Sequence, residues 1–203
     1  LTHIQAYLYQ KKEWNPRQEN AFAPALCNRI DRNTGGIVIA AKTAEGLRVM
    51  NQKIRDRELK KYYLCIVHGT LPRPAGRLEG YILKDEAKKQ VTVSSRPRPG
   101  AKTAVTLYET LAVRNGLSLV RCQLITGRTH QIRAQFAAAG HPLLGDGKYG
   151  SERQNKRYGR SYQALYSYRL EFCFTTDAGA LAPLDGQQFQ VEPVSYTHLT
   201  LPT

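Results

Sequence analysis

The middle third of the chain consists of short strand-like segments separated by turn residues. Strand-forming residues are concentrated at 62–68, 78–83, 90–94, 103–113 and 117–125. The last two segments are joined across Asn115-Gly116, a dipeptide that favours a two-residue hairpin turn. The pattern predicts an antiparallel meander. Since only a few helical segments are interspersed, it also predicts an α+β fold rather than a doubly wound parallel sheet.

A helix is predicted to follow Thr43, which can cap it, because Leu47, Met50 and Ile54 recur on one face. The residues expected on its solvent side are Arg48, Lys53 and Arg55. A second helix is predicted from His130 to about Ala139, with Thr129 as its cap and Gly140 as its stop. Its expected apolar face comprises Ile132, Phe136 and Ala139.

A further buried strand is predicted at residues 37–41, a short β-branched run introduced by Gly35 and Gly36. The glycine pair would allow a ligand or another backbone to come close. Asp31 would then lie on the loop that feeds this strand.

The longest apolar runs have the length of strands, so we expect no membrane span. The four cysteines are far apart, without the C-x-x-C spacing of a zinc site or the density of a disulfide scaffold, which favours a reduced cytoplasmic setting. The five histidines are dispersed, and the chain lacks P-loop, nucleophile-elbow and zinc-protease motifs. We therefore expect no metal site.

The chain carries a formal charge of +14 with a pI near 9.8. The positive charge belongs to residues 1–160, because residues 161–203 contain one basic residue, Arg169, and four acidic ones. Such an excess is typical of nucleic-acid binders. The alternative is a basic surface that serves solubility alone.

We predict one domain over residues 1–194, incomplete at its start. Residues 195–203 have a composition unrelated to what precedes them, and we interpret them as a non-native tail.

Two basic segments are candidate functional sites. Arg29 and Arg32 flank Asp31, which is either a reactive carboxylate or a salt-bridged turn. The segment 128–133, with an arginine at each end, either contacts a substrate or begins a helix with a solvated cationic face.

Three separated segments together resemble the RluA family of RNA pseudouridine synthases. The segments are N-R-I-D-R-N-T-G-G at 28–36, K-Y-Y-L-C-I-V-H-G at 61–69, and T-G-R-T-H-Q-I-R at 126–133 followed by G-H-P at 140–142 and G-D at 145–146. Three motifs in the family's order are far more specific than any one of them. Asn28, Gly35 and Cys65 depart from the family pattern without removing an ionisable catalytic group. The resemblance implies the family's fold, a mainly antiparallel mixed sheet with flanking helices and a central catalytic cleft.

The resemblance also implies isomerisation of uridine to pseudouridine in RNA, without a cofactor. Asp31 would be the catalytic carboxylate, and Arg133 would pair with it and keep it charged and oriented. Tyr63 would stack on the uracil and assist removal of the C5 proton, and Arg29 would brace the space left by a flipped nucleotide. The residues with phosphate or scaffold roles would be Lys61 and Arg128.

The implied partner is RNA, with large-subunit ribosomal RNA favoured and transfer RNA as the other candidate. We expect a monomer in the cytoplasm. The competing interpretation is a basic fragment or relative that binds RNA without modifying it.

Overall fold

The computed structural model describes residues 1–18 and 22–193. Its helices are α1 (Thr2–Gln10), α2 (Ala44–Arg55), α3 (Gln131–Ala138), α4 (Glu152–Arg157) and the 3₁₀ helix η1 (Gly179–Leu184). Its strands are β1 (Ala25–Leu26), β2 (Gly35–Gly36), β3 (Ala40–Ala41), β4 (Leu59–His68), β5 (Ala75–Asp85), β6 (Gln90–Ser94), β7 (Lys102–Arg114), β8 (Leu117–Leu124), β9 (Leu165–Phe172) and β10 (Gln188–Gln190). The predicted tail, 195–203, lies outside the described residues, and the single-domain boundary stays a prediction.

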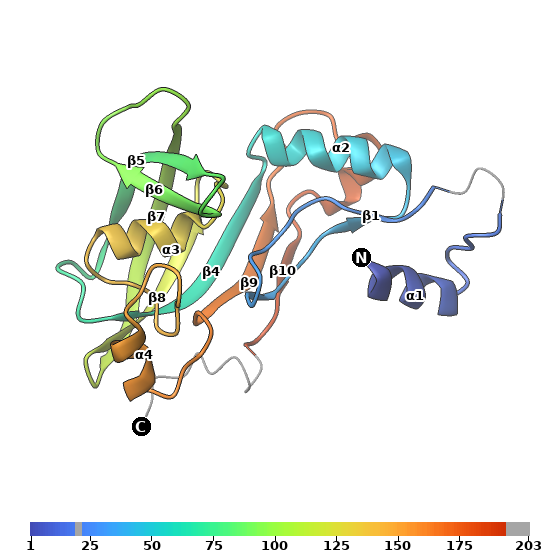
Figure 1. The fold of residues 1–203 in the computed structure, drawn as a ribbon. Coiled ribbons are helices and arrows are strands. Elements are labelled where there is room, and N and C mark those ends of the chain that lie inside the picture. The colour runs from blue at the N-terminus through green and yellow to red at the C-terminus, as the bar shows by residue number, and fades with distance from the viewer. Residues whose placement is uncertain (19–21, 194–203) are drawn as a thin grey trace.

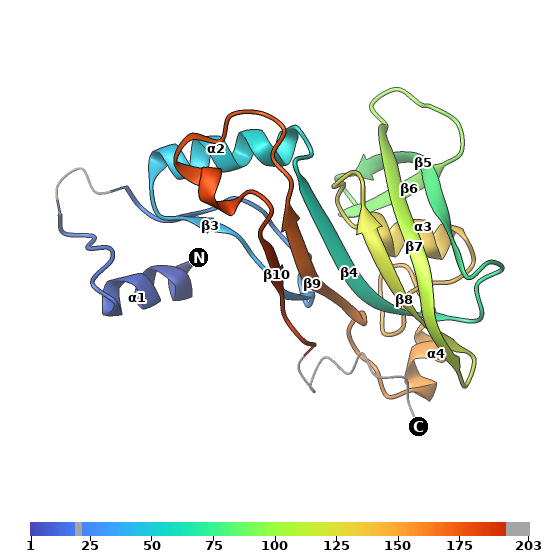
Figure 2. The same ribbon diagram turned by 180° about the vertical axis from the view of Figure 1, so that it is seen from behind.

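One large mixed sheet organises the described residues. Its strands run in the order β10-β9-β4-β8-β7-β5-β6, all antiparallel to their neighbours, and β2 adds to β9 in parallel. Helix α3 covers one face of the β5–β8 region, while α2 and η1 lie at the other end of the sheet (Figure 1). The reverse view shows β8 between β4 and β7 (Figure 2). This confirms the predicted α+β fold.

The hairpin between β7 and β8 is confirmed in detail. Asn115 and Gly116 have φ angles of 53° and 72°, the left-handed conformation that a two-residue hairpin turn requires at both central positions. The strands then pair with Arg114 opposite Leu117. The meander is therefore set by a local signal at its turn.

The core forms on both faces of the central strands. Alternate residues of β4 point to opposite faces, so Cys65 and Val67 pack with Ile132 and Phe136 of α3, whereas Ile66 packs in a separate cluster behind the sheet. These side chains are at most 4% exposed. The sheet therefore has apolar layers on both sides, and α3 is held firmly against it.

Helix α2 begins at the predicted residue, but one residue predicted to face solvent is buried. The Thr43 hydroxyl accepts a hydrogen bond from the Gly46 amide at 3.0 Å, which caps the helix. Arg48 and Arg55 are exposed, but the prediction for Lys53 is wrong, because its side chain is 1% exposed. Its ammonium group binds Glu58, five residues onward, and a distant segment that helical spacing alone does not reveal.

The predicted strand at 37–41 is also wrong as a single element. Gly36 has φ +107°, and a Cβ there would lie 2.1 Å from the backbone oxygen of Ser167, so the chain passes directly against β9. The Ile37 amide still donates to that oxygen at 2.8 Å. Beyond it the chain leaves β9, and only Ala40–Ala41 forms a strand, paired with β1. The run is half-buried, and its hydrogen bonds are divided between β9 and the segment that contains β1.

The start of α3 differs from the predicted cap. Thr129 is exposed, and the residue at the N-cap position is His130, with φ 52° and no side-chain cap. Ile132 and Phe136 are buried as expected, but Ala139 is exposed. The helix ends after Ala138 because Gly140, at φ +84°, stops it as predicted.

Among residues 1–18 and 22–193, no helix combines the length and the apolar character needed to cross a membrane.

Candidate active site

A pocket of about 260 Å³ lies between the loop before β2, the start of β4 and the start of α3. Five of the six sequence-predicted site residues line it: Arg29, Asp31, Lys61, Tyr63 and Arg128. The sixth, Arg133, contacts Asp31 from α3. Residues that are far apart in the sequence therefore meet at one site.

The loop that carries Asp31 is held by hydrogen bonds from two directions. The Thr34 amide donates to the Asp31 backbone oxygen at 3.0 Å, which closes a turn through Asn33 at φ 66°. The Gln163 amide group donates to the Arg32 backbone oxygen at 2.6 Å. On the other side of the loop, the Asn28 carboxamide accepts from the Ile39 amide at 2.7 Å. The carboxylate is thus presented from a fixed turn.

Arg133 lies between two carboxylates. Its Nη1 is 3.3 Å from Asp31 Oδ2, while its Nε and Nη2 donate to the two oxygens of Asp146 at 2.7 and 2.9 Å. The side chain of Asp146 has no exposed surface, that of Arg133 is 7% exposed, and that of Asp31 is 19% exposed. Asp31 is therefore the member of this group that a ligand in the pocket can reach.

Charge pairing offsets burial in this group. Burial alone would raise the pKa of the Asp146 carboxyl, but hydrogen bonds from Arg133 and from the Lys148 and Tyr149 amides bring it below its ordinary value. Burial would likewise lower the pKa of Arg133, and the two carboxylates raise it instead. Arg133 and Asp146 therefore stay ionised at neutral pH.

Tyr63 forms part of the pocket wall from β4 and is 8% exposed. Burial raises the pKa of its hydroxyl, and the negative charge of Asp31 raises it further. The side chain therefore presents an aromatic surface and a protonated hydroxyl close to the carboxylate.

Arg128 is positioned by a buried network around Gln131. The Gln131 side-chain oxygen accepts from the Arg128 amide at 3.0 Å and from the Thr126 hydroxyl at 2.8 Å. Its nitrogen donates to the Val105 backbone oxygen at 3.0 Å. The Arg128 guanidinium donates through Nε to the backbone oxygen of Thr103 at 3.0 Å. Thr126 and Gln131 of the third motif thus have a scaffold role that the sequence does not reveal.

Lys61 and Arg29 bring positive charge to the pocket without internal partners. Neither side chain makes a hydrogen bond or ion pair with the described residues. Arg29 is exposed, whereas Lys61 is half-buried, and burial lowers the pKa of its ammonium group. Both cations are free to meet an anionic ligand.

Three residues without a role predicted from the sequence also lie at this site. Asp146 anchors Arg133, and Tyr149 lies under it, with the guanidinium carbon 5.3 Å from the ring centroid. The Tyr149 hydroxyl is 2.8 Å from Nδ1 of His130 on the pocket wall. Of the three, Asp146 could have been identified from the sequence, because the Gly145-Asp146 pair belongs to the third motif.

The arrangement suits chemistry on a nucleoside. A carboxylate that is fixed and charge-paired can attack or stabilise an electron-poor carbon, and the aromatic wall can stack on a base. In the part of the chain that the structure describes, no group of three or more potential ligands could hold a metal ion.

Comparisons with known proteins identify relatives that act on nucleosides in RNA. The family model for RNA pseudouridylate synthase matches residues 2–138. An uncharacterized RNA pseudouridine synthase of Mycoplasma genitalium is 38% identical over 156 residues, which are 74% of this chain and 47% of that protein. Ribosomal large subunit pseudouridine synthase C of Escherichia coli is 32% identical over 156 residues, 74% of this chain and 48% of that protein.

The fold agrees with solved structures as well. Human RNA pseudouridylate synthase domain containing 4 superposes with a TM-score of 0.73 at 21% identity, covering 98% of this chain and 80% of that one. The chain belongs to the RNA pseudouridylate synthase family. It spans about half the length of the curated relatives named above.

Proposed function

We propose that this site isomerises uridine to pseudouridine in RNA, with ribosomal RNA of the large subunit as the substrate and Asp31 as the catalytic residue. The reaction breaks the bond between ribose C1′ and uracil N1, forms a bond between C1′ and C5, moves a proton from C5 to solvent and returns one to N1. The product is an isomer of the substrate, so the reaction requires no net oxidant, reductant or co-substrate.

The observation that carries the proposal is the 3.3 Å contact between Asp31 and Arg133 at the wall of a pocket. The guanidinium, fixed by Asp146, orients the Asp31 carboxylate toward the cavity and places a positive charge next to it. Asp31 is then free to act as a nucleophile at C1′ or C6, or to stabilise positive charge that develops at the glycosidic carbon.

The other pocket residues supply the remaining roles in the proposal. Tyr63 stacks on the uracil, and its hydroxyl assists removal of the C5 proton. A uridine must leave its helix to reach such a pocket, which requires a few kcal/mol of unstacking. Arg29, exposed at the rim, braces the vacated space, while Lys61 and Arg128 hold the phosphates of the extruded nucleotide.

The rRNA assignment is supported by the names of relatives such as the Escherichia coli protein and ribosomal large subunit pseudouridine synthase D of Borreliella burgdorferi. The test is incubation of the chain with unmodified large-subunit rRNA and, separately, with transfer RNA transcripts. Pseudouridine is then mapped by carbodiimide treatment and reverse transcription. Stops at defined uridines in rRNA are expected. RNA that is bound without any new stop would favour the non-catalytic alternative.

A further inference from the structure

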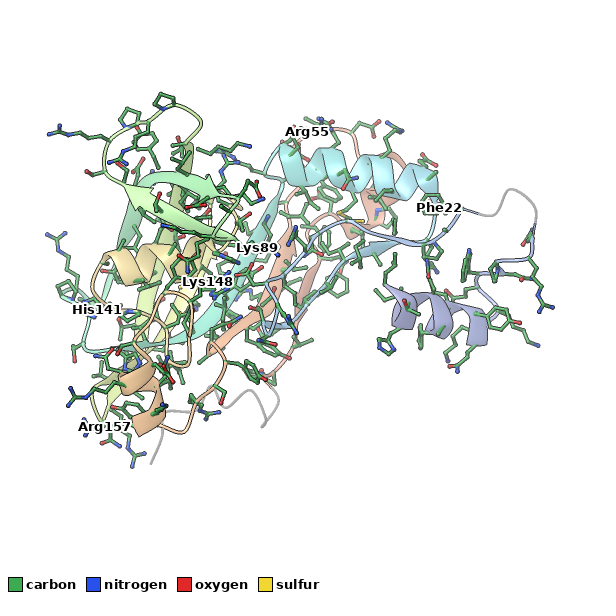
Figure 3. All side chains as sticks on the ribbon, viewed as in Figure 1. Phe22, Arg55, Lys89, His141, Lys148 and Arg157 are labelled. Carbon is green, nitrogen blue, oxygen red and sulfur yellow. The ribbon has the colours of Figure 1, made fainter. Side chains whose placement is uncertain are left out.

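A second groove, of about 250 Å³, continues from the pocket along the turn between α2 and β4. The two cavities share Lys61 and Arg128 in their walls. The groove adds Arg55 and Arg57, and Figure 3 shows Arg55 at the end of α2 that leads to β4. Every charged residue that lines it is a cation.

Two carboxylates, Asp56 and Glu58, are close to this groove in the sequence. Asp56 is exposed and accepts from Gln52 at 2.6 Å, and the Gln52 oxygen in turn accepts from the Arg55 guanidinium at 2.6 Å. Glu58 is buried, where it binds the Lys53 ammonium at 2.7 Å and accepts from the Thr176 hydroxyl at 2.8 Å. Asp56 therefore offsets part of the charge of the four cations that line the groove, Glu58 is neutralised by Lys53, and the groove stays positive.

Arg57 occupies a position that usually belongs to glycine. The Arg57 amide bonds back to Ile54 and the Glu58 amide to Lys53, which is the Schellman pattern that ends a helix. Arg57 is its left-handed residue, with φ 63°, where a side chain brings strain that glycine would not. Its guanidinium makes no hydrogen bond or ion pair with the residues described. Nothing inside the described fold accounts for an arginine at this position.

The cations follow one path away from the pocket. Lys61 and Arg128 stand where the two cavities meet, and Arg55 and Arg57 lie beyond them. A polymer with regularly repeated negative charge, entering the pocket with one unit, would continue along this path. Arginine is suited to such a ligand because its planar group donates two hydrogen bonds to phosphate oxygens.

We propose that this groove binds the backbone phosphates next to the nucleotide held in the pocket, with Arg55 and Arg57 as phosphate ligands. The inference rests on the proposed function, because it takes the pocket as the nucleotide site.

The first test measures the affinity of the full 203-residue chain for a fluorescent RNA stem-loop with one uridine in the loop, between 50 and 200 mM KCl. The variants are Arg55→Gln and Arg57→Asn, since asparagine tolerates the left-handed backbone. The matched control is Arg153→Gln, an exposed arginine on α4, far from α2 (Figures 1 and 2). Losing one phosphate contact should weaken binding roughly five- to eightfold at 0.1 M salt and lower the salt slope by about 0.7–0.9.

A further variant separates binding from folding. Arg57→Gly relieves the strained backbone, so we expect it to unfold at the same or a higher urea concentration than the wild type while it binds RNA as weakly as Arg57→Asn. A second measurement replaces single phosphates near the uridine by neutral methylphosphonates. At one position, the methylphosphonate should weaken binding by the wild type but not by Arg57→Asn, because that variant no longer has the arginine that contacts this phosphate.

The inference is overturned if both groove variants bind with the affinity and salt slope of the Arg153 control. It is also overturned if the methylphosphonate losses are the same in the wild type and the Arg57 variant at every position. These readouts require no turnover. A chain that binds RNA through the groove yet forms no pseudouridine therefore contradicts the proposed function and leaves the groove assignment standing.

Discussion

Asp146 accepts two hydrogen bonds, of 2.7 and 2.9 Å, from Arg133 and has no exposed side-chain surface. This pair positions the site, because the remaining nitrogen of the guanidinium, Nη1, is then directed at Asp31. The catalytic carboxylate in the proposal is thus positioned through an ion pair that is almost entirely buried.

Replacing Asp146 by Asn should destabilise the fold and disable the site together. The substitution leaves Arg133 buried without its close carboxylate, and loss of one partner of a buried pair costs about 3–5 kcal/mol. The control is Glu109→Gln, which removes a carboxylate that is 49% exposed and paired with Arg121. Its effect should stay below about 1 kcal/mol. Urea denaturation of both variants measures the difference, and equal effects would contradict the anchoring role of Asp146.

Replacing Gly36 by Ala should also be strongly destabilising, because a Cβ there would lie 2.1 Å from the Ser167 oxygen. The matched control is Gly147→Ala, where a Cβ would meet nothing within 4 Å. We expect a loss of several kcal/mol for the first, as for other strained or overpacked sites, and a change within about 1 kcal/mol for the second. Thermal unfolding measures both. A Gly36 variant as stable as the control would show that β2 does not pass so close to β9.

These contacts show what the sequence could and could not predict. The cap at Thr43 and the turn at Asn115-Gly116 were predictable because each depends on residues that are neighbours in the chain. The burial of Lys53 was not, since one of its partners, Thr176, lies 123 residues away. The helical pattern therefore assigned this lysine to the wrong face.

The candidate site divides in the same way. The contact between Asp31 and Arg133 was predicted from the resemblance of the motifs to a known family, and the spacing of the residues alone would not have predicted it. The scaffold role of Gln131 depends on its contact with β7, 26 residues away, and the contact between His130 and Tyr149 on the segment that follows α3, which no local pattern encodes.

The Tyr63→Phe variant tests the role of the tyrosine hydroxyl. The ring still fills the pocket wall, so RNA affinity and KM should change little. Because burial raises the pKa of the hydroxyl, it is protonated at neutral pH, and in the proposal it would pass a proton on rather than act as a free base. We expect kcat to fall about 10²-fold or more, the usual effect of losing a group in proton transfer. Steady-state kinetics would contradict this role if KM rose while kcat stayed constant.

Stability in acid should report on Glu58. Its hydrogen bond with Lys53, and those with Thr176 and Thr175, lower the pKa of the Glu58 carboxyl from 4.5 to about 2. The unfolded chain therefore binds more protons in this range, and the contribution of Glu58 is complete above pH 4.5 and is lost as the pH falls toward 2. Urea midpoints measured across this range should fall less steeply for Glu58→Gln than for the wild type. Parallel profiles would contradict the assignment.

The most direct test of the proposed chemistry is tritium release from RNA labelled at uracil C5, under single-turnover conditions, by the wild type and by Asp31→Asn. The substitution keeps the volume of the side chain and removes its charge. We predict release by the wild type, no release above background by the variant, and RNA affinities within a factor of about three of each other, since the change touches no phosphate ligand. Release by the variant at the wild-type rate would contradict the account.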